Sequence, residues 1–124
     1  MLLYTKDHTW VLTAGNRAKV GISDFAQGEL GDIAYVELPA PGKRLERGDV
    51  ACTVDSLKSS SEIYAPVSGT VAQVNGVLAS EENCSLINKD PLGQGWLMEL
   101  EMSEPDELQN LLTEKEYESY IKGE

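Results

Sequence analysis

Apolar and polar positions alternate in short runs along the first hundred residues, and this pattern predicts a chain built mainly of β-strands. Most runs are followed by Gly, Pro, Asn or Asp, which favour turns. Between the first two runs lies Gly15-Asn16, a pair typical of a tight hairpin turn. The predicted strands cover residues 9–12, 17–20, 33–38, 50–54, 62–65, 70–74 and 96–102.

One short helix is predicted in the N-terminal half. Ser23 can cap its first turn, and the helix continues to Leu30 and ends at Gly31. The polar stretch 78–90 is either a loop or a further short helix.

The C-terminal end has a helical pattern instead. Its apolar side chains recur at helical spacing. Ser103 and Thr113 each precede an acidic residue three positions later, as in a capping box. We therefore expect a helical segment over about 103–122. With no linker or low-complexity stretch before it, residues 1–124 are expected to form a single domain.

The net charge of -11 excludes several classes of partner. Residues 1–60 hold 7 basic and 8 acidic side chains, whereas residues 61–124 hold 3 basic and 13 acidic ones. Such a chain lacks the basic stripe that nucleic acids or anionic membrane surfaces require, and it favours partners with basic faces. No apolar stretch has the length of a signal peptide or a membrane span. A cytoplasmic protein, or a mature form without its leader, is expected.

The two cysteines and the single histidine indicate no metal site and no disulfide framework. Cys52 lies in an apolar run and is expected to be a small core residue. Cys84 lies in a polar stretch and is expected to be an exposed thiol.

A weak internal repeat gives Lys58 a central position. Residues 45–51 and 65–71 each read as an apolar residue, a turn, a glycine and a strand. Lys58 stands ten residues after Gly48 and eleven before Gly69. Two units related in this way can pack as facing sheets, which places Lys58 at the tip of the hairpin that joins them.

The residues around Lys58 are small and polar, so nothing near it in the sequence would bury its stem. A reachable amine on a firm turn suits covalent modification, because an amide bond removes the charge and attaches a long arm to a rigid support. The spacing alone leaves open a second interpretation, in which the lysine only keeps the hairpin tip soluble.

Several segments in the same order resemble the glycine cleavage system H protein family. The similarity covers about residues 4–112 and includes Val54-Asp55-Ser56-Leu57-Lys58-Ser59, which aligns with the family's lipoylation turn. It implies a mainly β barrel-sandwich hybrid of the lipoyl- and biotinyl-carrier type, with lipoic acid on Lys58 and Asp55 in ligase recognition. The similar segments are 4–11, 20–27, 30–33, 36–39, 54–59, 64–69 and 88–97.

The resemblance implies a carrier rather than an enzyme, and the chain itself offers no nucleophile with an acid–base partner. In this family, the lipoyl arm takes an aminomethyl group from glycine decarboxylase to an aminomethyltransferase. Dihydrolipoyl dehydrogenase then reoxidises the arm, and a lipoate ligase or lipoyltransferase attaches it.

One departure from the family pattern leaves alternatives open, and another preserves the charge of the residue it replaces. Thr9 stands where a Glu is common, and a neutral hydroxyl cannot pair with an ammonium group as a carboxylate does. H-like carriers of sulfur intermediates in heterodisulfide-reductase-like sulfur oxidation, and lipoyl relay proteins, are therefore alternatives. Asp55 replaces the usual Glu but keeps its charge.

Two further classes share the architecture. A biotin carrier usually has Met on both sides of its lysine, and Leu57 and Ser59 argue against it here. A purely structural module would never be modified. The intact mass of the protein from its native host distinguishes these classes: a lipoyl carrier shows a lipoyl increment, a biotin carrier a biotin increment, and a structural module no increment.

Overall fold

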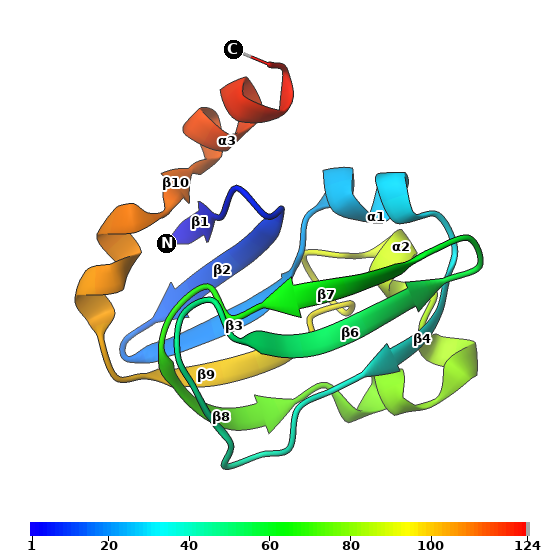
Figure 1. Ribbon diagram of the computed structural model, residues 1–124, viewed down its shortest axis with the longest axis horizontal. Coiled ribbons are helices and arrows are strands. Elements are labelled where there is room, and N and C mark those ends of the chain that lie inside the picture. Colours follow the sequence, from blue (N-terminus) through cyan, green and yellow to red (C-terminus); the bar gives the residue numbers. More distant parts are fainter. Residues whose placement is uncertain (124) are drawn as a thin grey trace.

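The computed structural model describes residues 1–123 and consists mainly of two antiparallel sheets (Figure 1). One sheet has the strand order β10-β1-β2-β3-β9-β8-β5 and the other the order β4-β6-β7. The expected mainly β architecture is confirmed. The strands are β1 (Leu2–Tyr4), β2 (Thr9–Ala14), β3 (Arg17–Ile22), β4 (Ile33–Glu37), β5 (Arg44–Leu45), β6 (Val50–Ser56), β7 (Ser60–Tyr64), β8 (Gly69–Val74), β9 (Met98–Met102) and β10 (Leu112–Thr113).

Short helices connect and flank the sheets. The predicted N-terminal one is confirmed as α1 (Asp24–Leu30), where the Ser23 side chain accepts a hydrogen bond from the N–H of Ala26 and Gly31 forms the C-cap. Residues 78–90, for which the sequence allowed either a loop or a short helix, contain short helical turns. The other helices are α2 (Leu86–Lys89), α3 (Glu114–Ile121) and the 3₁₀ turns η1 (Gly76–Ala79), η2 (Glu81–Asn83) and η3 (Pro105–Asn110).

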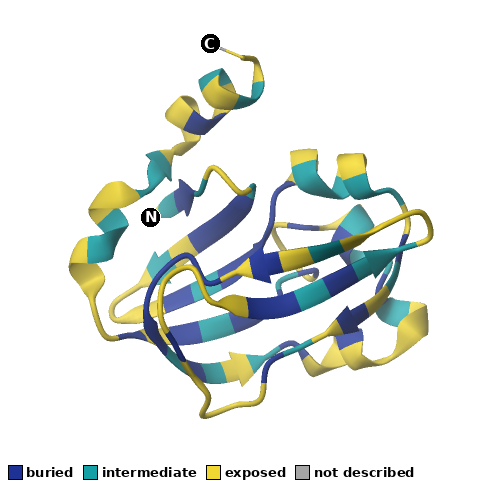
Figure 2. Cartoon of the chain, in the orientation of Figure 1, coloured by how far each residue is buried: buried dark blue, intermediate teal, exposed yellow. Residues whose placement is uncertain are grey.

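The main core lies between the two sheets, where the inward-facing positions of the strands are buried (Figure 2). Buried residues alternate with less buried ones along β8 and β9, which is the pattern that predicts strands in the sequence, whereas β2 and β3 each contain three consecutive buried residues. Its fully buried members include Val11, Val20, Val54, Val71, Leu97 and Leu100.

A smaller aromatic cluster lies between the N-terminal strands and α3, and we call Tyr4, Trp10 and Tyr117 the aromatic cluster. The rings of Tyr4 and Tyr117 stack with centroids 4.3 Å apart. The Trp10 indole N–H donates to the carbonyl of Pro91 at 2.9 Å. A Cβ on the cross-strand neighbour Gly21 would lie 2.6 Å from the indole ring, so only glycine fits there.

The C-terminal segment differs from the prediction in its first half. Residues Pro105–Asn110 form a 3₁₀ helix, and no side chain caps it, so the capping box expected at Ser103 is wrong. Leu112 instead pairs with Tyr4, because the open edge of β1 offers backbone hydrogen bonds that a longer helix would forgo. The capping box at Thr113 is confirmed at the start of α3.

The expectation of an exposed thiol at Cys84 is wrong. The 3₁₀ turns of the polar stretch bury Cys84 completely, and its Sγ donates to the Leu78 carbonyl at 3.3 Å. Burial raises the pKa of this thiol. Cys52 is buried as predicted, and burial raises its pKa to about 12. Within residues 1–123, no helix is long and apolar enough to span a membrane, and no group of acidic, His and Cys side chains is placed to hold a metal ion.

Candidate modification site

The hairpin that joins β6 to β7 projects from the sheet (Figure 1), and its tip is coloured as exposed in Figure 2. Lys58 lies at this tip, and its side chain is exposed. The two repeated units lie side by side, with Val50 paired to Tyr64 and Leu45 paired to Gly69. The structure therefore places the lysine where the repeat predicts it.

The hydroxyl of Ser56 holds the backbone of the hairpin tip together. Its oxygen accepts hydrogen bonds from the N–H groups of Lys58 at 3.3 Å and Ser59 at 3.0 Å, and the hydroxyl lies 3.1 Å from the Ser59 carbonyl, to which it donates. The Ser56 N–H donates to the same carbonyl at 2.8 Å. These bonds fix the turn at the base of the Lys58 side chain without burying that side chain.

Asp55 lies directly across the hairpin from Ser60, three residues before Lys58. The Ser60 hydroxyl donates a hydrogen bond to the carboxylate of Asp55. A negative charge is thus held in a defined place near the tip. The part of Asp55 in ligase recognition stays a prediction.

The tip also rests on the turn between α1 and β4, a contact that the sequence did not indicate. The N–H of Leu57 donates to the carbonyl of Asp32 at 3.0 Å. The Cε of Lys58 lies only 3.3 Å from the place that a Cβ on Gly31 would occupy. Lys58 is exposed as predicted, but the aliphatic part of its side chain lies next to Gly31.

A cavity of about 190 Å³ lies between β7 and α1, next to this turn. Most of its wall is apolar, and two carboxylates and one imidazole border it. Two of its lining residues, Glu29 and Leu30, directly precede Gly31, against which the aliphatic part of the Lys58 side chain lies. The lining residues are Asp7, His8, Ile22, Phe25, Ala26, Glu29, Leu30, Ser61 and Ile63.

A hydrogen-bonded group behind the cavity was not predicted. The Nδ1 of His8 and the hydroxyl of Ser23 each lie 2.7 Å from the hydroxyl of Tyr117. His8 has a φ of 67°, in the left-handed region, and its ring lies 4.8 Å from that of Phe25. Residues from three distant parts of the sequence thus fix the imidazole that borders the cavity. The sequence offered one signal for this hydrogen-bonded group, because His8 is the single histidine in the chain.

Thr9 does not border the cavity and is 1% exposed. Its N–H donates to the Thr5 hydroxyl and its carbonyl accepts from the Thr5 N–H. The buried Thr9 hydroxyl cannot contact a cation bound in the cavity. Any carboxylate that pairs with such a cation must therefore come from another residue.

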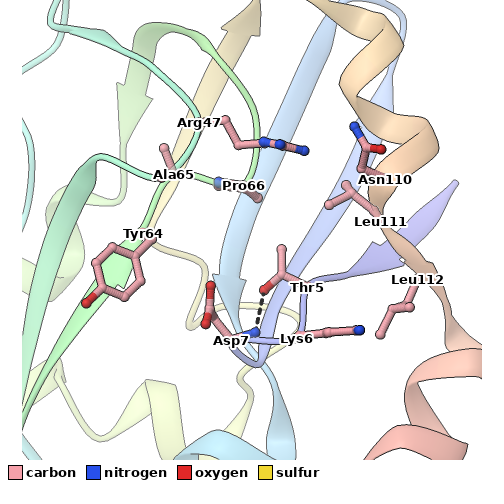
Figure 3. A pocket seen from close by; sticks show the side chains of 11 residues that line it. Thr5, Lys6, Asp7, Arg47, Tyr64, Ala65, Pro66, Asn110, Leu111 and Leu112 are labelled. Carbon is pink, nitrogen blue, oxygen red and sulfur yellow. Dashed lines mark hydrogen bonds between the residues drawn. The ribbon is translucent and has the colours of Figure 1, made fainter.

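A larger cavity, of about 490 Å³, lies at the other end of β7 (Figure 3). Its walls include Lys6, Arg47, Asp7 and the side chain of Leu111, so they mix both charges with apolar surface. None of the residues of the Lys58 hairpin tip lines it. The candidate modification site is therefore an exposed turn that lies apart from this cavity.

Comparison with known proteins decides the family. The sequence model of the glycine cleavage H-protein matches residues 2–124. The chain belongs to the glycine cleavage H-protein family. Curated relatives include the glycine cleavage system H proteins of Xanthobacter autotrophicus, 48% identical over 95% of this chain and 93% of that protein, and of Thermotoga maritima, 43% identical over 100% and 98%.

The solved structures agree with this assignment. A crystal structure of a glycine cleavage system H protein from Mycobacterium marinum superposes with a TM-score of 0.86 at 32% identity, covering 98% of this chain and 96% of that one. The expected barrel-sandwich fold and the expected role of a lipoyl carrier in glycine cleavage are thereby confirmed.

Proposed function

We propose that this chain carries lipoic acid as an amide on Lys58 and shuttles aminomethyl groups during glycine cleavage. The observation that carries the proposal is a single exposed lysine on a hydrogen-bonded hairpin tip, in a chain of this family. Between Lys43 and Lys89 no other lysine occurs in the sequence.

The residues at the tip fit covalent attachment of the lipoyl group. The neutral amine of Lys58 can attack the carbonyl carbon of an activated lipoate; the activating group leaves, and a proton passes to solvent. Since Lys58 is exposed, its amine is open to a modifying enzyme. When attached, the group supplies a strained disulfide that can take up and release a substrate group.

The cavity beside the hairpin suits an apolar arm that ends in a cation. Its apolar wall would contact the arm, and Asp7 and Glu29 would attract an ammonium group. These two carboxylates offer what Thr9 cannot, so the absence of the usual Glu does not argue against aminomethyl cargo.

The chain itself is proposed to be a non-catalytic carrier. Its partners would be glycine decarboxylase, an aminomethyltransferase, dihydrolipoyl dehydrogenase and a lipoate ligase or lipoyltransferase. The chain would act in the cytoplasm. The acidity of residues 61–124 favours partners with basic docking faces. A tethered arm can then visit several sites at a high effective concentration.

The proposal is tested first by attachment. Purified chain is incubated with a lipoate ligase, ATP and lipoate, and intact mass and peptide mapping locate the product. We expect one lipoyl increment on Lys58 and none in Lys58→Arg, whereas the exposed control Lys43→Arg keeps the full increment. Labelling of another lysine in Lys58→Arg would contradict the assignment.

The cargo is tested next with lipoylated chain and a glycine decarboxylase, by exchange of labelled bicarbonate into glycine. Wild type is expected to support exchange. Asp7→Asn combined with Glu29→Gln should weaken it, and the exposed pair Asp106→Asn and Glu104→Gln serves as the control. Lipoylated wild type without exchange would favour the sulfur-carrier or relay alternatives.

A further inference from the structure

Asn88 in α2 holds the turn between α1 and β4 from both sides. Its Oδ1 accepts a hydrogen bond from the N–H of Ile33 at 2.9 Å. Its Nδ2 donates to the carbonyl of Gly31 at 2.8 Å and to the Oε1 of Gln27 at 3.0 Å. An amide is needed here, because only an amide offers an acceptor and a donor pair at one side-chain end.

The turn that Asn88 holds is the one on which the hairpin tip rests. Asp32 lies between Gly31 and Ile33, both of which Asn88 binds, and its carbonyl accepts a hydrogen bond from the N–H of Leu57 at 3.0 Å. Leu57 directly precedes Lys58. A chain of hydrogen bonds therefore runs from Asn88 through the turn 31–33 to the residue next to the modified lysine.

Gly31 supports the side chain of Lys58 in a second way. Its φ of 81° lies in the left-handed region that favours glycine. A Cβ there would come within 3.3 Å of the Lys58 Cε and 3.9 Å of its Nζ. The stem thus lies across bare backbone at the C-terminal end of α1, where carbonyl oxygens attract an ammonium group.

We propose that the turn 31–33, held by Asn88, fixes the direction in which the Lys58 amine is presented to the modifying enzyme. Asn88 and Gly31 are then positioning residues for lipoylation, although neither is near Lys58 in the sequence. This inference rests on the proposed function, since it concerns the attachment of lipoate to Lys58.

The first test uses Asn88→Asp. The variant keeps an acceptor for the Ile33 N–H but faces the carbonyl of Gly31 with an oxygen in place of a donor. We expect kcat/KM for enzymatic lipoylation to fall by about tenfold. The control Asn110→Asp makes the same change of charge at an exposed position and should stay at the wild-type rate.

A second pair of variants tests the stem contact. Gly31→Ala should lower kcat/KM because its methyl group displaces the Lys58 stem. Gly42→Ala is the matched control, because Gly42 also has a left-handed φ, of 91°, but nothing lies within 4 Å of its Cβ, so lipoylation should stay unchanged. If Gly31→Ala fails to fold, Asn88→Asp still tests the proposal.

Two further readouts separate positioning from loss of structure. Acetylation of Lys58 by acetic anhydride needs no defined direction, so its rate should be similar in Asn88→Asp and wild type. Hydrogen exchange should rise at the Leu57 amide and stay unchanged at Val54 and Ile63 in the strands.

The results also distinguish the inference from the proposed function. Wild-type chain that is not lipoylated at Lys58 would overturn the function. Wild type that is lipoylated, with Asn88→Asp and Gly31→Ala at the same kcat/KM, would overturn the positioning role alone. A parallel loss of enzymatic and chemical acylation would also overturn it.

Discussion

The hairpin tip, residues 55–60, and the aromatic cluster of Tyr4, Trp10 and Tyr117 are both held in place, but by different forces. The tip is exposed and is fixed by hydrogen bonds of Ser56 and of the Leu57 N–H. The aromatic cluster is at most 5% exposed and is fixed by stacking and burial, together with hydrogen bonds at the Trp10 indole and the Tyr117 hydroxyl.

The difference separates presentation from stability. An exposed hydrogen bond contributes only about 0.5–1.5 kcal/mol, whereas truncation of a buried aromatic side chain costs about 3–5 kcal/mol. Changes at the tip should therefore disturb the modification of Lys58 and leave the fold intact. Changes in the aromatic cluster should do the reverse.

The largest effect is expected from Trp10→Ala. It removes a side chain that is 0% exposed and leaves the Pro91 carbonyl without its donor. The free energy of unfolding in urea should fall by about 3–5 kcal/mol. Lipoylation per folded molecule should stay unchanged. Leu12→Ala, at a more exposed position of the same strand, is the control and should cost far less.

At the tip, Ser56→Ala should have the opposite signature. Loss of the hydroxyl frees the N–H groups of Lys58 and Ser59, so kcat/KM for lipoylation should fall by about tenfold, with less than about 1 kcal/mol lost in stability. Ser56→Thr should restore most of the rate, and the exposed control Ser80→Ala should change neither quantity. A fall in melting temperature without a change in rate would contradict the comparison.

A smaller effect is expected from Asp55→Ala. The variant removes the carboxylate that Ser60 holds three residues before Lys58. Loss of one charged contact with the ligase should slow lipoylation by about fivefold, measured as kcat/KM by mass spectrometry. Unchanged unfolding in urea shows that the fold survives. An unaltered rate would remove Asp55 from ligase recognition.

The smallest effect concerns the main core and pH. Burial raises the pKa of Cys52 from 9.0 to about 12, so above pH 9 the unfolded chain loses this proton and the folded chain keeps it. The contribution of Cys52 to stability is therefore complete below pH 9 and falls as pH rises toward 12. Between pH 9 and 10 the loss should be about 1 kcal/mol.

Cys52→Ala should remove this part of the slope in urea unfolding at a series of pH values. Burial also raises the pKa values of Tyr4 and Tyr117 above 10.0. Unfolded tyrosines therefore lose their protons mainly above the pH at which an unfolded Cys does, so the comparison belongs between pH 9 and 10. An equal slope in both chains would show that Cys52 is not the cause.

Much of the fold follows from local patterns. The pair Gly15-Asn16 predicts the β2–β3 hairpin, and Ser23 and Gly31 predict both ends of α1. The errors lie where distant segments compete with local preference. Ser103 caps no helix and instead donates its N–H to the carbonyl of Ser68, Leu112 pairs with β1, and Cys84 is buried because the turns around it fold onto β4.

By itself, the sequence determined the mainly β architecture, the hairpin with Lys58 at its tip and the family to which the chain belongs. These follow from periodicity, turn residues and motif order, which are local properties of a chain. Only the tertiary structure decided what supports that lysine. Asn88, Gly31 and Asp32 meet the hairpin tip through hydrogen bonds and van der Waals contacts between segments far apart in the sequence. No local pattern encodes such contacts, because they form only when the sheets and helices have packed.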